Sequence, residues 1–178
     1  HPCTDTPAVV TDLRARSISY PVQYHFLGSL TKLMEGEQLA ELGLMKNAGA
    51  IGFTDGGTPI RNSSVLRRAL QYAQRLDLPI FLTPVDPDLD KEGVMHEGIV
   101  STRIGLRGIP EASEIIGASR LAALAEDTGA KVCIGPLSSA KSLNYITSSE
   151  NIQVRLASRS MILSDSAVET SAYNPSTH

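Results

Sequence analysis

The chain has 178 residues, of which 42% are hydrophobic, and a formal net charge of −3 with a pI near 5.8. A chain of this length buries one sizeable core, so we expect a single domain over residues 1–178. The weak negative charge argues against nucleic acid and anionic membranes as partners, and no apolar run reaches the roughly 20 residues of a membrane span.

The amino-terminal residues show no charged stretch followed by an apolar one, so no secretory leader is expected. Cys3 and Cys133 are far apart in the sequence, and neither has a C-x-x-C neighbour. A disulfide framework or a zinc knuckle is therefore not expected. These features together predict a reduced, cytoplasmic protein.

Strand-like and helix-like segments alternate along the chain. The strand-like segments are short and apolar or alternate with period two, whereas the helix-like ones repeat apolar residues every three or four positions. In chain order we expect a strand at 20–30, a helix at 36–50, a strand at 50–57, a helix at 62–77, a strand at 78–85, a helix at 110–129, a strand at 130–139, a helix at 140–149 and a strand at 152–163.

Several residues mark the ends of these helices. Gly49 and Gly129 follow the last apolar positions of the first and third helices and are the expected stops. Ser63 or Ser64 is expected to cap the second helix at its amino terminus. Pro110 is expected in the first turn of the third helix, where its missing N–H costs nothing.

The alternation of strands and helices predicts an α/β fold with a parallel sheet of about five strands and right-handed crossovers. A closed (β/α)8 barrel needs eight strands and typically about 250 residues. The chain is therefore expected to form either an open doubly wound sheet or part of a barrel.

Three segments carry a resemblance to a known family: FTDGGTPIRNSSVLRRALQYAQRLDLPI (53–80), EGVMHEGIVSTRIGLRGIPEASE (92–114) and SSAKSLNYI (138–146). They resemble the middle of dihydroorotases, the cyclic-amide hydrolases of pyrimidine biosynthesis. The second segment is the most specific, because it joins the family's G-V-M-x-E-G loop to a G-L-x-G-x-P turn before an acidic helix start. The resemblance runs from PCTDTP (2–7) to AYNPS (172–176) and implies strands three to seven of a TIM barrel.

The resemblance also implies a chemistry. In the family a bound divalent metal pair, zinc, lowers the pKa of a water molecule and polarises the ring carbonyl, while a carboxylate moves the proton. The ligands end successive strands: an H-x-H pair on the first, an Asp or modified Lys on the fourth, and His residues on the fifth and sixth. A catalytic Asp ends the eighth strand. The groups of the first and eighth strands would lie outside this chain.

The ligand positions inside this chain carry other residues. The family's fifth-strand His falls on Thr83, its sixth-strand His on Pro136, and a further His after the seventh strand on Ser160. A hydroxyl or a proline ring offers no neutral nitrogen lone pair to a metal. Asp55, in FTDGG against the family's F-T-D-D-G, is the only position that keeps a ligand type.

Two further positions concern the substrate. The second Asp of F-T-D-D-G is Gly56 here, and the substrate-binding Asn of the family's M-P-N-T is Cys3. Asn174 keeps the Asn of the family's N-P-P motif and is the one candidate, vestigial, substrate-binding residue. The resemblance therefore implies no catalytic residue, no metal site and no zinc cofactor in this chain.

Other patterns with possible chemistry favour structural roles. Ser138 and Ser139 lie in no G-x-S-x-G elbow, and DPDLDKE (86–92) lacks the Gly and Glu of a calcium loop. The FTDGG turn lacks the spacing of a nucleotide-binding loop. His96 and Glu97 are adjacent in the sequence and are therefore expected to point apart.

Three functions remain open. The leading hypothesis is a catalytically silent dihydroorotase homologue that assembles with the catalytic subunit of aspartate transcarbamoylase, as some members of the resembled family do. The alternative is a divergent cyclic amidohydrolase of which this chain is a fragment. A third possibility is a small-molecule binder that uses the vestigial pocket around Asp55, Thr83 and Asn174.

A partial barrel is also expected to self-associate, or to cover an edge with its irregular tail after residue 163, because its free sheet edges and uncovered inner face must be shielded from water. Self-association is the favoured route, because the tail is polar. The strand residues expected on that uncovered face are Ile51, Phe53, Ile80, Leu82, Val132 and Ile134.

Overall fold

The computed structural model describes residues 3–91, 93–146 and 149–158. In chain order the elements are α1 (Pro7–Ser17), β1 (Leu27–Ser29), the 3-10 turn η1 (Lys32–Met34), α2 (Leu42–Ala48), β2 (Gly52–Thr54), α3 (Ser63–Arg75), β3 (Ile80–Leu82), β4 (Met95–His96), α4 (Ile99–Ile104), β5 (Gly108–Ile109), α5 (Glu111–Thr128), β6 (Val132–Leu137), α6 (Ala140–Leu143) and β7 (Ile152–Leu156).

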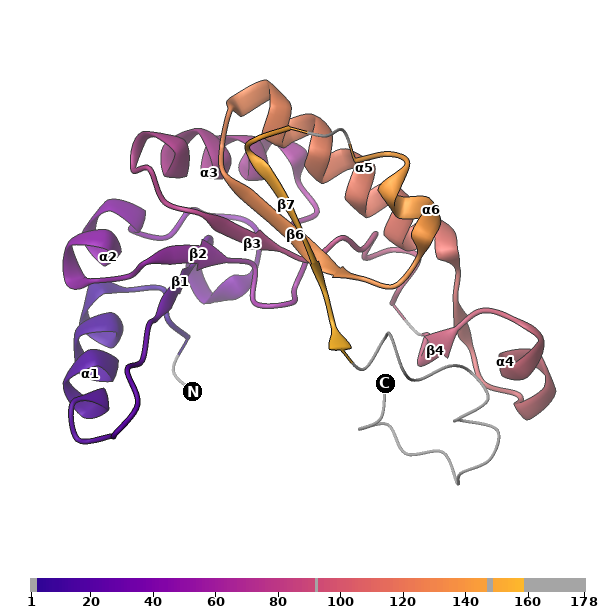
Figure 1. Ribbon diagram of the computed structural model, residues 1–178, viewed down its shortest axis with the longest axis horizontal. Helices are drawn as coiled ribbons and strands as arrows, with labels where there is room; N and C mark the ends of the chain where they lie inside the picture. Colours follow the sequence, from indigo (N-terminus) through magenta and orange to yellow (C-terminus); the bar gives the residue numbers. More distant parts are fainter. Residues whose placement is uncertain (1–2, 92, 147–148, 159–178) are drawn as a thin grey trace.

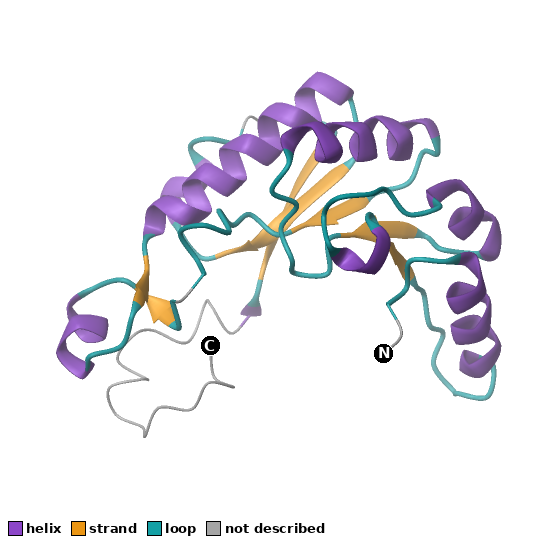
Figure 2. Cartoon of the chain, turned by 180° about the vertical axis from the view of Figure 1, so that it is seen from behind, coloured by secondary structure: helices purple, strands orange, loops and turns teal. Residues whose placement is uncertain are grey.

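The central sheet has five parallel strands in the order β1-β2-β3-β6-β7. The short strands β4 and β5 form a separate parallel ladder. The elements form an arch, with α3 and α5 along its outer side, α1 near one end and α4 near the other (Figure 1). The view from behind also shows α3 and α5 along the outer side of the sheet (Figure 2). A parallel sheet of five strands with alternating helices confirms the expected fold class.

The register of the sheet decides which side chains meet the helices. Phe53, Ile80 and Val132 are partners across β2, β3 and β6, and each is at most 2% exposed. They belong to one core cluster with the apolar faces of α3 and α5. The main contributors from α3 are Val65, Leu66, Ala69, Leu70 and Ala73, and those from α5 are Ala118, Leu121, Ala122 and Ala125.

The expectation that six strand residues lie on an uncovered face is wrong for five of them. Phe53, Ile80, Leu82, Val132 and Ile134 are buried under the helices, and only Ile51 is largely exposed, at 46%. Successive strand residues point to opposite faces, so a pattern of alternate apolar residues does not say which face the helices cover.

The face without helices carries the intervening residues. Thr54 pairs with Phe81 and Phe81 with Cys133 across β2, β3 and β6. All three are only half-buried. The uncovered face therefore carries Thr54, Phe81 and Cys133 at these positions, and not the Phe, Ile and Val side chains that were expected there.

The expectation that Ser63 or Ser64 caps α3 is wrong, because the helix begins at Ser63 and its cap is Asn62. The side chain of Asn62 accepts hydrogen bonds from the backbone N–H groups of Ser64 and Val65, at 2.9 and 3.3 Å. Asn is as good a cap as Ser because its amide oxygen reaches the same free N–H groups. In α5, Pro110 is the residue before the first helical residue, Glu111, and does not lie in the first turn as expected.

Gly49 and Gly129 end α2 and α5 in the left-handed conformation, as expected. The missing side chain of Gly49 also leaves space for the guanidinium of Arg14, with which a Cβ at this position would clash. Arg14 uses this space to donate a 3.0 Å hydrogen bond to the carbonyl of Ala48. The contact docks α1 on the carboxyl end of α2.

The sequence patterns missed helix α1, of which only Val10 is buried. A helix that buries one residue has no stripe of apolar side chains, so its sequence lacks the apolar repeat by which helices are predicted. The patterns also missed β4, α4 and β5, which are all short.

Most expected elements are shorter in the structure, and the first two along the chain are clear examples. The strand expected at 20–30 is limited to Leu27–Ser29, the residues that pair with β2. The helix expected at 36–50 begins only at Leu42, since Leu39 forms a bridge with Thr31 instead. Among the described residues, no helix is long and apolar enough to cross a membrane.

Candidate functional site

Two of the expected ligand positions lie side by side at the carboxyl ends of neighbouring strands. Asp55 follows β2 and Thr83 follows β3, and the two strands are paired in parallel. In α/β folds this edge of the sheet is where binding and catalytic groups usually gather. It is therefore the place to test for a metal site.

Both carboxylate oxygens of Asp55 accept hydrogen bonds from the protein. Its Oδ2 accepts a 2.8 Å hydrogen bond from the backbone N–H of Thr83. Its Oδ1 accepts 3.0 Å hydrogen bonds from the Thr83 hydroxyl and from the N–H of Gly57. Asp55 is 5% exposed, so these donors stabilise a buried carboxylate that would otherwise be costly.

The space beside this carboxylate is very small. It has a volume of about 10 Å³ and is bounded by Asp55, Thr83 and residues of α3 and α5, among them Leu66 and Arg120. This volume holds at most about one water molecule, whereas small-molecule pockets measure about 300–1,000 Å³. Among the described residues, the expected pocket around Asp55 and Thr83 is therefore closed.

Arg120 helps to close it, a role that the sequence patterns did not indicate. From α5 its guanidinium donates to the carbonyls of Ile60 and Arg61, at 2.7 and 3.1 Å, and to Oγ of Ser63. Burial lowers the pKa of Arg120, and the nearby Asp86 acts in the opposite direction. A guanidinium remains protonated in proteins, so Arg120 ties the β2–α3 loop to α5 with its charge in place.

Pro136 stands apart from this pair. It is exposed, follows a cis peptide bond with Gly135, and lies at an irregularity of the β6–β7 pairing. Its ring offers no donor or acceptor.

Gly56 occupies the position of the second Asp in the family's F-T-D-D-G motif. Gly56 adopts φ +65°, and a Cβ there would lie 2.6 Å from Sδ of Met34. The thioether of Met34 thus lies against the backbone where the family has a carboxylate.

Cys3 lies beside the end of β1. Its thiol is half-buried, and burial raises its pKa while a hydrogen bond with Ser29 acts the other way. The backbone confirms the proximity, because Ser29 N–H donates to the carbonyl of Thr4 at 2.7 Å. Ser160 and Asn174 lie outside the described residues.

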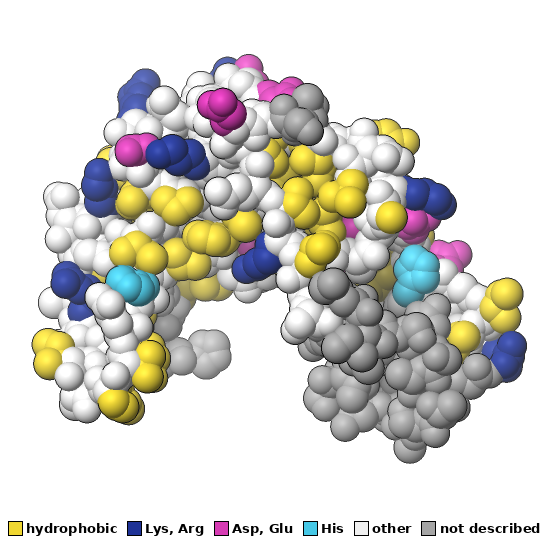
Figure 3. All heavy atoms as spheres, in the orientation of Figure 1, with side chains coloured by type: hydrophobic (Ala, Val, Ile, Leu, Met, Phe, Trp, Pro, Cys, Tyr) yellow, Lys and Arg dark blue, Asp and Glu magenta, His cyan; other side chains and the backbone are white. Residues whose placement is uncertain are grey.

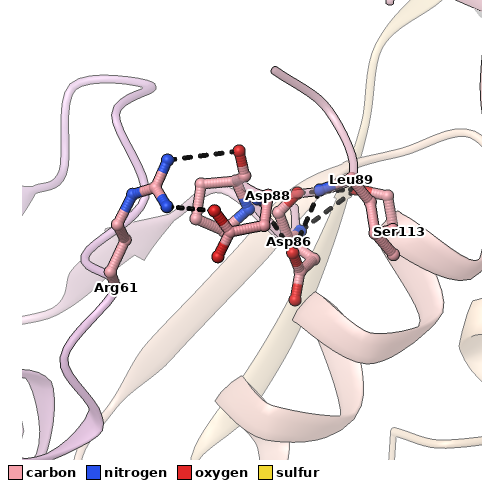
Figure 4. A network of polar contacts seen from close by, with 6 residues as sticks. Arg61, Asp86, Asp88, Leu89 and Ser113 are labelled. Atoms are coloured by element: carbon pink, nitrogen blue, oxygen red, sulfur yellow. Dashed lines mark hydrogen bonds and ion pairs between the residues drawn. The ribbon is translucent and has the colours of Figure 1, made fainter. Parts of the chain in front are cut away.

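The loop after β3 is held by a polar network rather than left in solvent (Figure 4). Oδ1 of Asp86 accepts from the N–H groups of Asp88 and Leu89, at 2.9 and 3.2 Å. Ser113 exchanges hydrogen bonds with the backbone of Asp86. Arg61 pairs with the carboxylate of Asp88. The aspartates of DPDLDKE thus act as turn and loop anchors.

A second polar cluster joins the start of α5 to the loop after β6. Oε2 of Glu114 accepts from the N–H and hydroxyl of Ser138, and its Oε1 accepts from the N–H of Ser139. The carboxylate of Glu111 accepts from Ser139 Oγ at 2.6 Å and from Lys141 Nζ at 2.7 Å. The two serines therefore have structural partners, as the sequence suggested.

These contacts predict an acid sensitivity. The hydrogen bonds from Lys141 and Ser139 lower the pKa of Glu111 below its ordinary value of 4.5. A lowered folded-state pKa gives stability that is present above the ordinary value and lost as the pH falls below it. We expect Glu111→Gln to lose less stability than the wild type between pH 6 and about pH 3, measured by urea unfolding. Glu126→Gln, at an exposed position of α5, is the control. Parallel losses in wild type and Glu111→Gln would contradict the assignment.

A larger hollow, of about 820 Å³, lies at the carboxyl ends of the short strands β4 and β5, beside α4 and the start of α5. Its lining includes His96, Glu97, Arg103 and Glu111. The carboxylate of Glu111 is already engaged by Ser139 and Lys141. Within the described ranges, no group of three or more His, Cys, Asp and Glu side chains is placed to hold a metal ion.

Comparisons with known proteins identify the family. The family model described as Dihydro-orotase-like matches residues 16–142. A dihydroorotase from Pelotomaculum thermopropionicum is 40% identical over 171 residues, which cover 94% of this chain and 40% of that protein. A dihydroorotase from Syntrophobacter fumaroxidans is 44% identical over 120 residues, 67% of this chain and 27% of that protein.

A solved structure supports the fold. The L-hydantoinase (dihydropyrimidinase) from Arthrobacter aurescens superimposes with a TM-score of 0.74 at 12% identity, over 94% of this chain and 40% of that one. This chain thus spans less than half of the proteins it matches, and its five parallel strands correspond to part of their barrel. By sequence and fold together, the chain belongs to the dihydroorotase-like family.

Proposed function

We propose that this chain is a non-catalytic dihydroorotase-like protein of pyrimidine biosynthesis and a structural partner of the aspartate transcarbamoylase catalytic subunit. The observation that carries the proposal is the Asp55–Thr83 contact. The one carboxylate that keeps a ligand type accepts three hydrogen bonds from Thr83 and Gly57. These donors and the space of only about 10 Å³ beside the carboxylate argue against a metal ion there.

The chemistry of the substituted positions supports the same conclusion. Hydrolysis of a cyclic amide at neutral pH needs an activated water, which in this family a metal pair supplies. Thr83 carries a hydroxyl that donates to Asp55, and Pro136 carries no polar group. Neither residue can replace an imidazole.

A structural role is consistent with how the strand ends are tied. Arg120, Asp86 and Glu114 each join loops at this edge to α5 through several hydrogen bonds. Such contacts hold a surface in one shape, which favours binding of a partner because less conformational entropy is lost. The identity of the partner rests on the family resemblance.

The first test is the metal content and activity of the 178-residue chain. After purification in the presence of zinc and desalting, we expect elemental analysis to find far less than one zinc per chain, and no hydrolysis of dihydroorotate. Stoichiometric zinc that is lost in Asp55→Asn would contradict the proposal. Binding of the partner is tested separately by sedimentation with purified aspartate transcarbamoylase catalytic subunit, where two species that sediment independently would refute the assembly.

The alternative remains a divergent cyclic amidohydrolase. It is favoured by the relatives named dihydroorotase, because this chain covers only 40% of the Pelotomaculum protein and 27% of the Syntrophobacter protein. In that case the ligands would come from a longer protein. An H-x-H pair ahead of this region, together with metal-dependent hydrolysis by the longer protein, would support the alternative.

A further inference from the structure

The hollow of about 820 Å³ beside α4 lies where ligand sites of α/β folds are usually found. Its lining includes Glu97 and Gly98, directly after β4, and Pro110 and Glu111, directly after β5. Binding groups usually gather at the carboxyl ends of parallel strands. The volume is also within the roughly 300–1,000 Å³ of small-molecule pockets. Figure 3 shows acidic side chains and a histidine close together on this side of the arch, near β4.

Close packing of the β4–β5 ladder holds the backbone of Glu97 in place. Its N–H donates a 2.9 Å hydrogen bond to the carbonyl of Ile109. Gly108 of β5 lies so close that a Cβ there would clash with the backbone of Glu97. The N–H of the next residue, Gly98, donates at 2.9 Å to Oγ of Ser101, which is 2% exposed. This edge of the hollow is therefore formed before any ligand binds.

Two side chains at the hollow are not used by the fold. Glu97 is half-buried and His96 is exposed, and within the part of the chain that the structure describes no hydrogen bond or ion pair engages the carboxylate or the imidazole. Glu111 adds a second carboxylate, which keeps lone pairs beyond those that accept from Ser139 and Lys141. Hydrogen bonds from Lys141 and Ser139 are the main causes that lower the pKa of Glu111, and the neighbouring His96 adds to them.

The hollow therefore offers negative charge and hydrogen-bond acceptors. A half-buried carboxylate without a partner is costly, so a cation that reaches Glu97 gains free energy. A metal ion does not fit, because no group of three or more His, Cys, Asp and Glu side chains among the described residues is placed to hold one. An ammonium group fits better, since it carries three N–H donors, which carboxylates and a neutral imidazole accept. Arg103 also lines the hollow, but it lies in the last turn of α4, at the end of the helix away from Glu97.

We propose that the hollow binds an alkylammonium ligand, that is, a primary amine on an alkyl chain. The amine donates to Glu97, Glu111 and His96, and the alkyl chain lies against Ile99 and Pro110, which also line the hollow. Ile99 is 78% exposed, and the methylene chains of charged groups cover such apolar surface while the charged end binds elsewhere. A free polyamine and a lysine side chain of another protein both carry this group. The proposal is independent of the proposed function.

An NMR titration of the 178-residue chain with pentylamine tests the proposal at about pH 7.5, where the amine is protonated. We expect saturable shifts of the amide signals of residues 96–111, with a dissociation constant on the order of 1 mM. Added salt should weaken the binding because it screens the charges. The uncharged n-pentanol, of equal chain length, should leave these signals in place. Equal shifts with n-pentanol, or no saturable shifts within 96–111, would overturn the proposal.

Glu97→Gln is the matched variant, because it removes the charge and keeps the shape of the side chain. We expect it to raise the dissociation constant of pentylamine by about tenfold or more, since a charge-assisted hydrogen bond is lost. Glu126→Gln, the same substitution at an exposed position of α5 outside the hollow, should leave the constant unchanged. Equal affinities of the wild type and Glu97→Gln would show that the amine binds elsewhere and refute the site.

Spermidine and Nα-acetyl-lysine methylamide then separate the two sources of the ligand. Each is added to the complex of the chain with pentylamine, and displacement is followed on the same amide signals. Stronger displacement by spermidine supports the proposal with a free polyamine as the ligand. Stronger displacement by the lysine derivative supports it with a lysine side chain of a partner protein. Failure of both to displace pentylamine would refute the hollow as an alkylammonium site.

Discussion

Asp55→Ala is expected to lower the free energy of unfolding by about 2–4 kcal/mol. The substitution leaves the N–H groups of Thr83 and Gly57 without an acceptor at a site where the carboxylate is 5% exposed. The space beside it, about 10 Å³, admits at most one water molecule as a substitute. Urea unfolding monitored by circular dichroism measures the loss.

Asp88→Ala is the matched control. Its carboxylate also pairs with a partner, Arg61, but its side chain is 76% exposed. Exposed ion pairs contribute less than about 1 kcal/mol, so this variant should be nearly as stable as the wild type. If the Asp55 and Asp88 variants lost equal stability, the buried contact between β2 and β3 would not have the structural role assigned to it.

Gly117→Ala is the second substitution with a large expected effect, although alanine normally favours a helix. A Cβ at Gly117, in the middle of α5, would lie 2.4 Å from the carbonyl carbon of Pro84 and from the backbone N of Val85. Backbone atoms cannot move aside as a side chain can, so overpacking outweighs the gain in helix propensity of about 1 kcal/mol. We expect a net loss of about 2–3 kcal/mol, measured by the same unfolding experiment.

Gly129→Ala separates this packing effect from backbone conformation. Gly129 ends the same helix at φ +66°, and a Cβ there would meet nothing within 4 Å. Only the left-handed conformation disfavours alanine at this position, at a cost of about 1 kcal/mol. A Gly117→Ala variant that was more stable than the wild type would show that the β3 loop and α5 do not approach so closely in solution.

Much of the fold was predictable because its signals are local. The apolar stripe of α3 and the stop at Gly129 depend on residues a few positions apart, and both are confirmed. Helix α1 escaped prediction because its single buried residue, Val10, and the hydrogen bond of Arg14 to Ala48 concern packing against α2. Such contacts leave no periodic trace in the sequence.

The candidate site shows the same division. The absence of imidazoles at residues 83 and 136 is visible in the sequence. That Thr83 donates twice to Asp55, and that Arg120 ties the adjoining loop to α5, is not visible, because these residues are brought together from separate elements. The sequence therefore identifies the substituted ligand positions, whereas the hydrogen-bond partners of Thr83 and Arg120 follow only from the fold.

The sequence by itself determined the alternation of strands and helices, the parallel sheet and the family, because periodicity, caps and motifs are properties of neighbouring residues. Only the tertiary structure decided which face of the sheet the helices cover. It placed Phe53, Ile80 and Val132 under α3 and α5 and left the residues at 18–25 exposed. A strand pattern repeats every two residues and is the same from either side. The choice of face therefore depends on long-range packing, which no local pattern contains.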